Sequence, residues 1–289
     1  MNWLVYHIVS GHSFFTGVAL LIIAALASTR SHRILKRVTV LAFLIGPIAI
    51  ILSSTAIPYW FYAVAAVITC GWIVSRFKKN WRPNAAYLAA AVWFAAAVIE
   101  LPYHIIPSLD STHSHSIAVI GDSVTAGVGG DETSETWPSI LAREHQLDVQ
   151  DISHMGETAA SALKRAKANQ ITASVVVVEI GGNDVLGSTS AAQFAQDLDA
   201  LLSHLAVDER QLLMFELPLP PFCHEYGRVQ RQLAAKYNVR LIPKRVFLSV
   251  IAGGDSTLDT IHLSQSGHRT MANCVWRLVS SAFAPDSAP

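Results

Sequence analysis

The stretch from Ser116 to Gly130 has the sequence Ser-Ile-Ala-Val-Ile-Gly-Asp-Ser-Val-Thr-Ala-Gly-Val-Gly-Gly. A short apolar run stops at Gly121, an acidic residue and a serine follow at once, and small residues and glycines come next. This pattern predicts a buried strand that ends in a loop or a helix start. Ser123 is therefore expected at the carboxyl end of a strand, which is the edge of an open α/β sheet where ligands bind.

Ser123 has two interpretations from this stretch alone. A helix that begins there points free backbone N–H groups at any developing negative charge, which makes the serine a candidate nucleophile. Gly-Asp-Ser ahead of a helix also gives an ordinary N-cap serine. The decision depends on whether a base and oxyanion donors occur later in the chain.

Asp259 and His262 supply the partners that a serine nucleophile requires. The hydroxyl needs an imidazole to take its proton, and the imidazole needs a carboxylate that fixes its tautomer and stabilises its charged form. Asp259 precedes His262 by three residues, within reach of one local turn. The same spacing also occurs in ordinary pairs of loop residues.

Two further segments offer oxyanion donors. The strand-like run Val175–Ile180 is followed by Gly-Gly-Asn-Asp, and the side-chain amide of Asn183 is a suitable donor at the same sheet edge. Gly156 follows another strand-like run, Leu147–Ile152, and offers a backbone N–H with no side chain in the way.

Together these segments resemble the SGNH (GDSL-like) hydrolase family over about residues 116–283. The resemblance is closest to the bacterial thioesterase I/lysophospholipase-like branch, because Val178-Glu179-Ile180 leads into the third block and Trp137-Pro138 follows the serine at the matching distance. Ser153-His154-Met155 precedes Gly156, where the family often has an Asn. The four family blocks are Gly121-Asp122-Ser123, Gly156, Gly181-Gly182-Asn183-Asp184 and Asp259-Thr260-Ile261-His262.

The resemblance implies a flavodoxin-like three-layer α/β/α SGNH-hydrolase domain with a parallel sheet. It implies that Ser123 is the nucleophile, His262 the base and Asp259 the carboxylate that orients the base. Ser123, Gly156 and Asn183 would then form the oxyanion hole. The chemistry requires no cofactor and no metal, and no Cys/His spacing suggests a metal site.

The fold class also follows from the order of the predicted elements, independently of the family. Strands and helices alternate after Ser123, which indicates a parallel sheet covered by helices on both faces. The expected strands are 147–152, 175–180, 211–217 and 239–242, and the expected helices are 137–144, 158–167, 191–205 and 225–236.

The composition divides the chain into two parts of opposite character. With 52% hydrophobic and 15% charged residues, the chain is too apolar for an ordinary soluble protein. Residues 1–107 carry eight Lys/Arg and one acidic residue, whereas residues 108–289 carry thirteen basic and twenty acidic residues. The second part has no basic patch or aromatic array, so a nucleic-acid partner is not expected.

Four apolar stretches fill the first part, and each is close to the roughly 20 residues that cross a hydrocarbon core. We interpret them as transmembrane helices of an integral membrane protein whose partner is the lipid bilayer. The alternatives are a buried helical bundle in a soluble protein and, for the first stretch, a cleaved signal peptide. The stretches are about 7–28, 34–54, 58–74 and 85–105 of a membrane domain 1–107, followed by a linker 108–115, the hydrolase domain 116–283 and a tail 284–289.

The basic residues predict the orientation of these helices. All eight lie around the connection of the first and second stretches, where Lys36 and Arg37 fall at the start of the second, or between the third and fourth. The positive-inside rule places both loops in the cytoplasm. Both termini and the hydrolase domain are then expected outside, in the periplasm if the membrane is a bacterial inner membrane.

The sequence therefore predicts a membrane-anchored serine esterase or lipase that cleaves acyl esters, such as lysophospholipids or other acyl lipids, outside the cytoplasm. The alternative is an O-acetyl esterase or acyltransferase that acts on envelope or exported polysaccharide. The acyl chain length, the leaving group and the oligomeric state stay open. A disulfide between Cys223 and Cys274 also stays open, because sequence does not show whether their Cα atoms come within bonding range.

Overall fold

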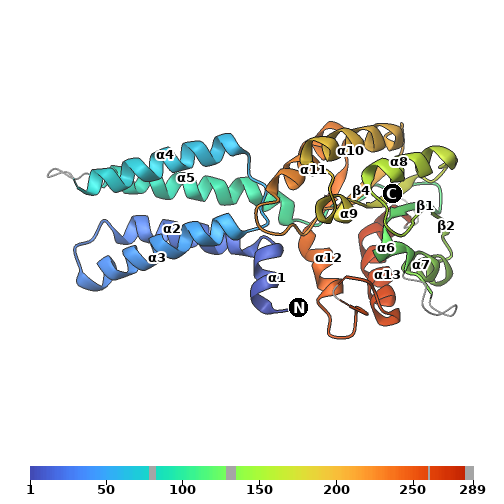
Figure 1. Ribbon diagram of the computed structural model, residues 1–289, viewed down its shortest axis with the longest axis horizontal. Helices are drawn as coiled ribbons and strands as arrows, with labels where there is room; N and C mark the ends of the chain where they lie inside the picture. Colours follow the sequence, from blue (N-terminus) through green and yellow to red (C-terminus); the bar gives the residue numbers. More distant parts are fainter. Residues whose placement is uncertain (78–82, 128–134, 260, 284–289) are drawn as a thin grey trace, which may run out of the picture. The chain divides into compact units, whose positions relative to one another are not determined.

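The computed structural model describes residues 1–77, 83–127, 135–259 and 261–283. The chain forms two compact units (Figure 1). The α/β unit contains Met1–Asn2, Ile105–Leu219 and Glu225–Pro289, and the helical unit contains Trp3–His104 and Pro220–His224.

A five-stranded parallel sheet forms the centre of the α/β unit. Its order, β2-β1-β3-β4-β5, is that of the flavodoxin-like doubly wound fold. The four valines of β3 are fully buried, as expected for a central strand covered on both faces. The strands are β1 (Ser116–Gly121), β2 (Asp148–Asp151), β3 (Val175–Glu179), β4 (Gln211–Phe215) and β5 (Arg240–Ile242).

Helices cover both faces of the sheet (Figure 1). On one face α7 and α12 pack against α13, and their apolar side chains share a core with Ile117 and Val177. On the other face α8 packs against α10. The helices are α6 (Ser123–Ala126), α7 (Trp137–His145), α8 (Ala159–Ala168), α9 (Gly182–Leu186), α10 (Ala191–Leu205), α11 (His224–Lys236), α12 (Lys244–Ile251), α13 (Gln265–Val279) and the 3₁₀ helix η2 (Ser280–Phe283).

The prediction of an α/β domain with a parallel sheet is therefore confirmed. The expected helix 191–205 matches α10 at both ends, because Ser190 caps its start and an apolar stripe runs through it. Residues expected to form a free linker are tied to the α/β unit: Leu109 is buried, and the N–H of Thr112 donates to the carbonyl of Ala282 at 2.7 Å.

The helical unit consists mainly of two helical hairpins, α2–α3 and α4–α5 (Figure 1). In the first, α2 and α3 approach closely at Gly17, where an added Cβ would lie 2.6 Å from the carbonyl oxygen of Gly46. Also, α2 packs against α5, which packs against α4. The elements are α1 (Trp3–Val9), α2 (His12–Ala27), α3 (Arg33–Leu52), α4 (Tyr59–Arg76), α5 (Asn84–Glu100) and the 3₁₀ helix η1 (Leu101–His104).

The first apolar stretch is not the continuous helix that its composition predicts. It breaks at Ser10–Gly11, and α1 and α2 meet at a bend of 83°. Gly11 has φ +84°, a left-handed backbone that interrupts the helix and that glycine adopts without steric cost. Hydrophobic composition alone does not indicate this break, because it does not distinguish the backbone conformation at Gly11.

Two helices of the described residues are long and apolar enough to cross a membrane, α3 and α5 with its η1 extension. The bent pair α1–α2 would be a third span if it is counted as one. The α4 helix is not among these candidates, so the four crossings expected from sequence stay a prediction.

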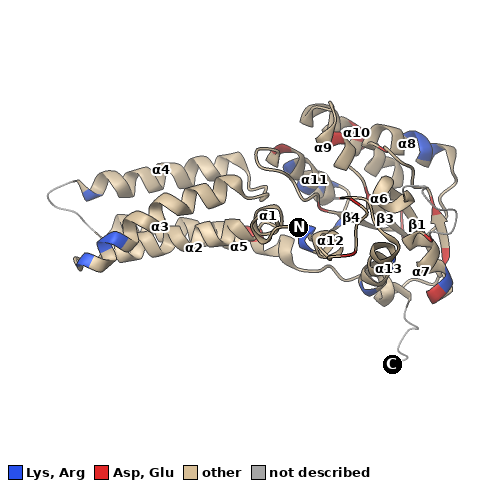
Figure 2. Cartoon of the chain, turned by 60° about the horizontal axis from the view of Figure 1, so that its bottom comes forward, with Lys and Arg blue, Asp and Glu red and all other residues tan. Residues whose placement is uncertain are grey.

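Basic residues gather at one end of the helical unit (Figure 2). Arg33, Lys36 and Arg37 lie in the first turns of α3, and Arg76 is the last residue of α4. The remaining residues of the second basic loop, Lys78, Lys79 and Arg82, lie outside the described part of the chain. The two hairpin connections that we expect in the cytoplasm thus extend from the same end of the unit.

All three cysteines lie in the described ranges and are free thiols. The disulfide between Cys223 and Cys274 that the sequence left open is not formed. Burial raises the pKa of the Cys274 thiol above its ordinary value.

Candidate active site

Ser123 is the first residue of α6, directly after the carboxyl end of β1. The side chain of Asp122 caps this short helix by accepting a hydrogen bond from the N–H of Val124 at 2.9 Å. A Cβ at Gly121 would collide with the side chain of Thr125, so the turn requires glycine. The Gly-Asp-Ser sequence thus provides the tight turn, the cap and the half-buried hydroxyl in order.

Asp259, His262 and Ser123 form one chain of hydrogen bonds. The Nε2 atom of His262 lies 3.1 Å from Oγ of Ser123, and its Nδ1 atom lies 2.7 Å from Oδ2 of Asp259. This arrangement fits a neutral imidazole that donates from Nδ1 to the carboxylate and accepts the serine proton at Nε2.

A local turn holds the Asp–His pair in this geometry. Oδ1 of Asp259 accepts hydrogen bonds from the N–H groups of Ile261 at 2.7 Å and of His262 at 2.9 Å. These N–H groups, above all that of Ile261, together with the imidazole hold the pKa of Asp259 well below its usual range. The carboxylate is therefore ionised at neutral pH and can stabilise a charged imidazole.

Asn183 is the second residue of α9, just beyond the end of β3. The turn before it needs Gly181, which has φ +116° and where a Cβ would lie 2.8 Å from Cδ1 of Leu217. The side-chain amide of Asn183 donates to the carbonyl of Glu157 at 3.0 Å and to Oδ2 of Asp122 at 3.3 Å. Asn183 thus joins the loop after β2 to the residue beside the serine.

Gly156 lies in that same loop between β2 and α8, exposed and with φ +72°. No atom lies within 4 Å of the position that a Cβ would take, so its surroundings are open. The N–H of His154 donates to the carbonyl of Gly121 at 3.0 Å, which ties the loop to the end of β1. The expected site residues therefore lie on short helices and loops that follow the carboxyl ends of the strands or, for Asp259 and His262, hydrogen-bond to Ser123 there.

A buried acid pair lies beneath the serine turn, and the sequence did not single it out. Oε2 of Glu179, the last residue of β3, accepts from Oγ1 of Thr125 at 3.0 Å and from the N–H of Asp122 at 3.4 Å. Burial raises the pKa of both carboxyl groups, and the nearby charge of Asp122 raises that of Glu179 further, well above its ordinary value. The raised pKa favours the neutral form of Glu179, which holds the turn through these two hydrogen bonds.

The only sequence signal for this role was an acidic residue at the end of a run of four valines, at a position that a buried strand would occupy. A further buried acid, Asp184, accepts from the N–H of Ala159 at 3.0 Å and fixes α9 to the start of α8. Burial raises its pKa as well.

His268 is a second histidine close to this region, but it is built into the fold. It is buried, and its Nδ1 atom accepts from the N–H of Trp137 at 3.2 Å. Burial lowers the pKa of its imidazole, so the ring stays neutral. It stabilises the start of α7 and leaves His262 as the imidazole that faces Ser123. Within the described residues, no group of three or more His, Cys, Asp or Glu side chains is arranged to hold a metal ion.

The α/β unit is similar to known proteins in sequence and in fold. Esterase TesA of Pseudomonas aeruginosa is 28% identical over 177 residues, which cover 56% of this chain and 87% of that protein. The Thioesterase 1/protease 1/lysophospholipase L1 of Escherichia coli is 29% identical over 140 residues, covering 44% of this chain and 65% of that protein. The crystal structure of TesA aligns with a TM-score of 0.51 at 27% identity, over 58% of this chain and 99% of that structure.

Residues 119–270 match the GDSL-like Lipase/Acylhydrolase family. The matched region contains Ser123, Gly156, Asn183, Asp259 and His262, and it amounts to more than half of the 289 residues. The chain therefore belongs to the GDSL-like lipase/acylhydrolase family and is an SGNH-type hydrolase of ester bonds.

Proposed function

We propose that this protein is a membrane-anchored serine esterase that cleaves acyl lipids such as lysophospholipids outside the cytoplasm. The observation that carries the proposal is the hydrogen-bonded chain from Ser123 through His262 to Asp259. Because the carboxylate of Asp259 fixes the proton of His262 on Nδ1, Nε2 is available to take the proton of the serine.

In the first half of the reaction, Oγ of Ser123 attacks the carbonyl carbon of the ester and its proton passes to Nε2 of His262. Collapse of the tetrahedral intermediate breaks the bond to the leaving oxygen, which takes that proton and departs as an alcohol. The acyl group then remains on Ser123. Asp259 stays ionised throughout and stabilises the transient imidazolium.

The negative oxygen of the intermediate is held by the N–H groups of Ser123 and Gly156 and by the side-chain amide of Asn183. Asn183 uses both amide hydrogens in the resting structure, and its bond to Asp122 at 3.3 Å is longer than its bond to Glu157 at 3.0 Å. We therefore assign the Asp122 bond as the one that Asn183 exchanges for the oxyanion.

In the second half, a water molecule attacks the acyl-enzyme and gives a proton to Nε2 of His262. The second tetrahedral intermediate collapses, the proton returns to Oγ of Ser123, and a carboxylic acid leaves. No group beyond these side chains and water is required for the balance of atoms.

The lipid substrate class is supported by two observations. The relatives include proteins named esterase and thioesterase/lysophospholipase. The same chain carries apolar helices long enough to enter a membrane, joined to the α/β unit by a short segment. A catalytic domain tethered in this way meets lipid esters at high local concentration.

The outward orientation is supported by the distribution of charge. Basic residues gather at one end of the helical unit, where the α2–α3 and α4–α5 connections lie (Figure 2). With both connections in the cytoplasm, four crossings leave the α/β unit on the other side. Coenzyme A thioesters, which belong to the cytoplasm, are then not the natural substrate.

The test measures hydrolysis of p-nitrophenyl acetate and of palmitoyl lysophosphatidylcholine by the full chain and by Ser123→Ala. Ser188→Ala, which changes an exposed serine of the same unit, is the control. We expect Ser123→Ala to lose both activities and the control to keep both. Hydrolysis by Ser123→Ala near the unsubstituted rate would overturn the assignment of the nucleophile. Ser123-dependent hydrolysis of the acetate ester alone would overturn the lipid substrate.

A further inference from the structure

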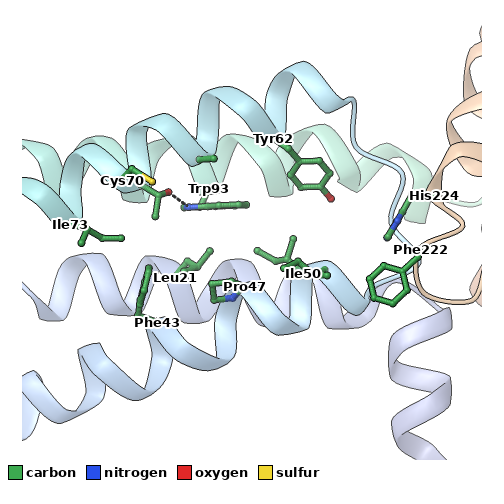
Figure 3. Close-up of a pocket in the computed structure, with 13 residues that line it drawn as sticks. Leu21, Phe43, Pro47, Ile50, Tyr62, Cys70, Ile73, Trp93, Phe222 and His224 are labelled. Atoms are coloured by element: carbon green, nitrogen blue, oxygen red, sulfur yellow. Dashed lines mark hydrogen bonds between the residues drawn. The ribbon is translucent and has the colours of Figure 1, made fainter.

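A partly open cavity of about 500 Å³ lies in the helical unit (Figure 3). Its wall comes from α2, α3, α4 and α5 and from the segment Pro220–His224. The volume lies within the roughly 300–1,000 Å³ of pockets that bind small molecules. Nothing in the proposed ester hydrolysis uses this cavity.

The cavity exists because two neighbouring helices do not close on each other. The α2 helix packs against α3 and α5, and α4 packs against α5, whereas α3 and α4 share few contacts. Small side chains of α4, at Ala66, Thr69 and Cys70, face the gap, and Pro47 of α3 lies opposite (Figure 3). The side chains therefore leave open a space that larger residues would have filled.

The cavity is long and narrow. Its wall on α4 runs from Tyr62 to Ile73, about 16 Å at the ~1.5 Å rise of a helix. Dividing the volume by this length gives a mean cross-section of about 30 Å². This shape suits one extended chain better than a compact ring or a sugar.

The residues that line the cavity favour an apolar ligand. None of the described residues that line it carries a formal charge, and Leu21, Phe43 and Ile50 are typical of its surface. Two polar groups of the wall already have partners: Nε1 of Trp93 donates to Oγ1 of Thr69 at 3.0 Å, and that hydroxyl donates to the carbonyl of Ala65 at 2.7 Å. A polar ligand would lose its hydrogen bonds to water here without replacement.

The end of the cavity has a different character. Phe222 and His224 lie there (Figure 3), and the imidazole Nε2 of His224 is 2.6 Å from the carbonyl oxygen of Ser53. Phe222 has φ +71°, a left-handed backbone that is an outlier for a bulky residue and that concentrates at ligand-binding positions. Its ring is largely exposed, so it is available for contact with an apolar ligand.

The segment that carries Phe222 and His224 also connects the cavity to the catalytic edge along the chain. It follows β4, one of the parallel strands whose carboxyl ends define the edge where Ser123 and Asn183 lie, and it ends at His224, the first residue of α11. The residues just after that edge therefore belong to the helical unit.

We propose that this cavity binds the acyl chain of a single-chain membrane lipid, a lysophospholipid. The proposal rests on the proposed function as a lipid esterase and adds to it a chain-binding site made by the helices. The helices then do more than anchor the enzyme, because they bind a long apolar chain.

The test uses the full-length Ser123→Ala protein in lipid nanodiscs, so that a bound ester is not turned over. The probe is lysophosphatidylcholine with a photoactivatable diazirine at the end of its chain, and labelled positions are found by mass spectrometry of peptides. We expect saturable labelling of cavity residues such as Phe43 and Cys70 that unlabelled lysophosphatidylcholine displaces. Labelling that never saturates would mean contact with bulk lipid and would overturn the proposal.

A matched pair of substitutions on one helix sharpens the result. Ala66→Trp places a large side chain in the cavity wall, whereas Ala63→Trp places the same side chain on α4 outside that wall; both positions are exposed. Displacing about two methylenes weakens chain binding by about tenfold, so Ala66→Trp should raise the half-saturating concentration by that factor. Ala63→Trp should leave it unchanged. Equal effects of the two variants would overturn the proposal.

Two features keep this test independent of folding and of the proposed function. If Ala66→Trp does not fold, Cys70→Leu fills less of the space and should still raise the half-saturating concentration. Esterase activity is measured separately on p-nitrophenyl acetate with unsubstituted protein and Ser123→Ala. Unsaturable labelling beside Ser123-dependent esterase activity refutes the cavity alone, and esterase activity that survives Ser123→Ala refutes the proposed function alone.

Discussion

Replacing Glu179 by Gln or by Ala should have opposite outcomes, although both remove the same carboxyl group. Glu179 is buried at the end of β3 and accepts hydrogen bonds from the Thr125 hydroxyl and the Asp122 N–H. Because burial raises the pKa of Glu179 and favours its neutral form, Gln has the same charge as that form and nearly the same shape. The Gln oxygen can accept both bonds, and its NH₂ can donate to the Asp122 carboxylate.

The magnitudes follow from these bonds. Glu179→Gln keeps every partner and should change the free energy of unfolding by less than about 1 kcal/mol. Glu179→Ala leaves the Thr125 hydroxyl and the Asp122 N–H buried without an acceptor, at about 1–3 kcal/mol each, so the loss is roughly 2–6 kcal/mol. At about 2–4 °C per kcal/mol for a domain of this size, the Ala variant should inactivate at least about 4 °C lower.

The pH dependence of stability distinguishes a protonated Glu179 from an ionised one. The pKa of Glu179 is raised in the folded state, so this residue stabilises the protein fully only below its unfolded pKa. That stability is lost as the pH rises from the unfolded pKa, about 4.3, toward the raised folded value. Glu179→Gln does not titrate there, and its stability relative to the unsubstituted protein should therefore rise from pH 5 to pH 9.

The assay is the midpoint temperature of irreversible loss of p-nitrophenyl acetate hydrolysis, measured at both pH values. Asp208→Asn, a carboxylate-to-amide change at an exposed position, is the control and should shift nothing. A Gln variant as unstable as the Ala variant, or one whose relative stability falls with rising pH, would refute the reasoning that Glu179 is protonated.

Three further outcomes are expected. Asn183→Ala should lower kcat by about 10²- to 10³-fold, as for loss of one oxyanion donor, and a raised KM with normal kcat would instead make Asn183 a substrate-binding residue. Asp259→Asn should lower kcat for p-nitrophenyl acetate by up to about 10⁴-fold, because the NH₂ group of Asn would face Nδ1 of His262 and favour the wrong tautomer. A loss of less than about tenfold would contradict this role of Asp259. Alkaline phosphatase fused after Pro289 should be active and a cytoplasm-only fluorescent protein there dark, and the reverse pattern would place Ser123 in the cytoplasm.

The parts of the fold that were predictable from sequence are those set by local pattern. The β-branched runs of β1 and β3 and the apolar stripe of α10 appear where expected, because burial on both faces or on one stripe leaves a direct periodic signal. The blocks around Ser123 and His262 were recognisable because tight turns at strand ends need particular residues at fixed spacing.

The parts that were not predictable depend on contacts between distant residues. Glu179 stabilises the serine turn by accepting a hydrogen bond from Thr125, which lies 54 positions earlier in the chain. A local sequence pattern does not reveal a contact between residues that far apart. The α12 helix begins at Lys244, whose charged side chain would suggest a surface loop from sequence. In the structure Lys244 is buried, and its Nζ forms an ion pair with Glu216 at 3.5 Å. The break at Gly11 and the gap between α3 and α4 likewise follow from backbone conformation and helix contacts rather than from composition.

The central claim is that Ser123 is the acylated nucleophile of a serine esterase, and covalent trapping tests it most directly. The full-length protein is treated with a fluorophosphonate, digested and analysed by mass spectrometry, with Ser188→Ala and Ser123→Ala treated in parallel. The account predicts one phosphonylated serine, Ser123, modified in the unsubstituted protein and in Ser188→Ala and absent from Ser123→Ala. Stoichiometric modification at another residue, or inactivation without any adduct on Ser123, would contradict it.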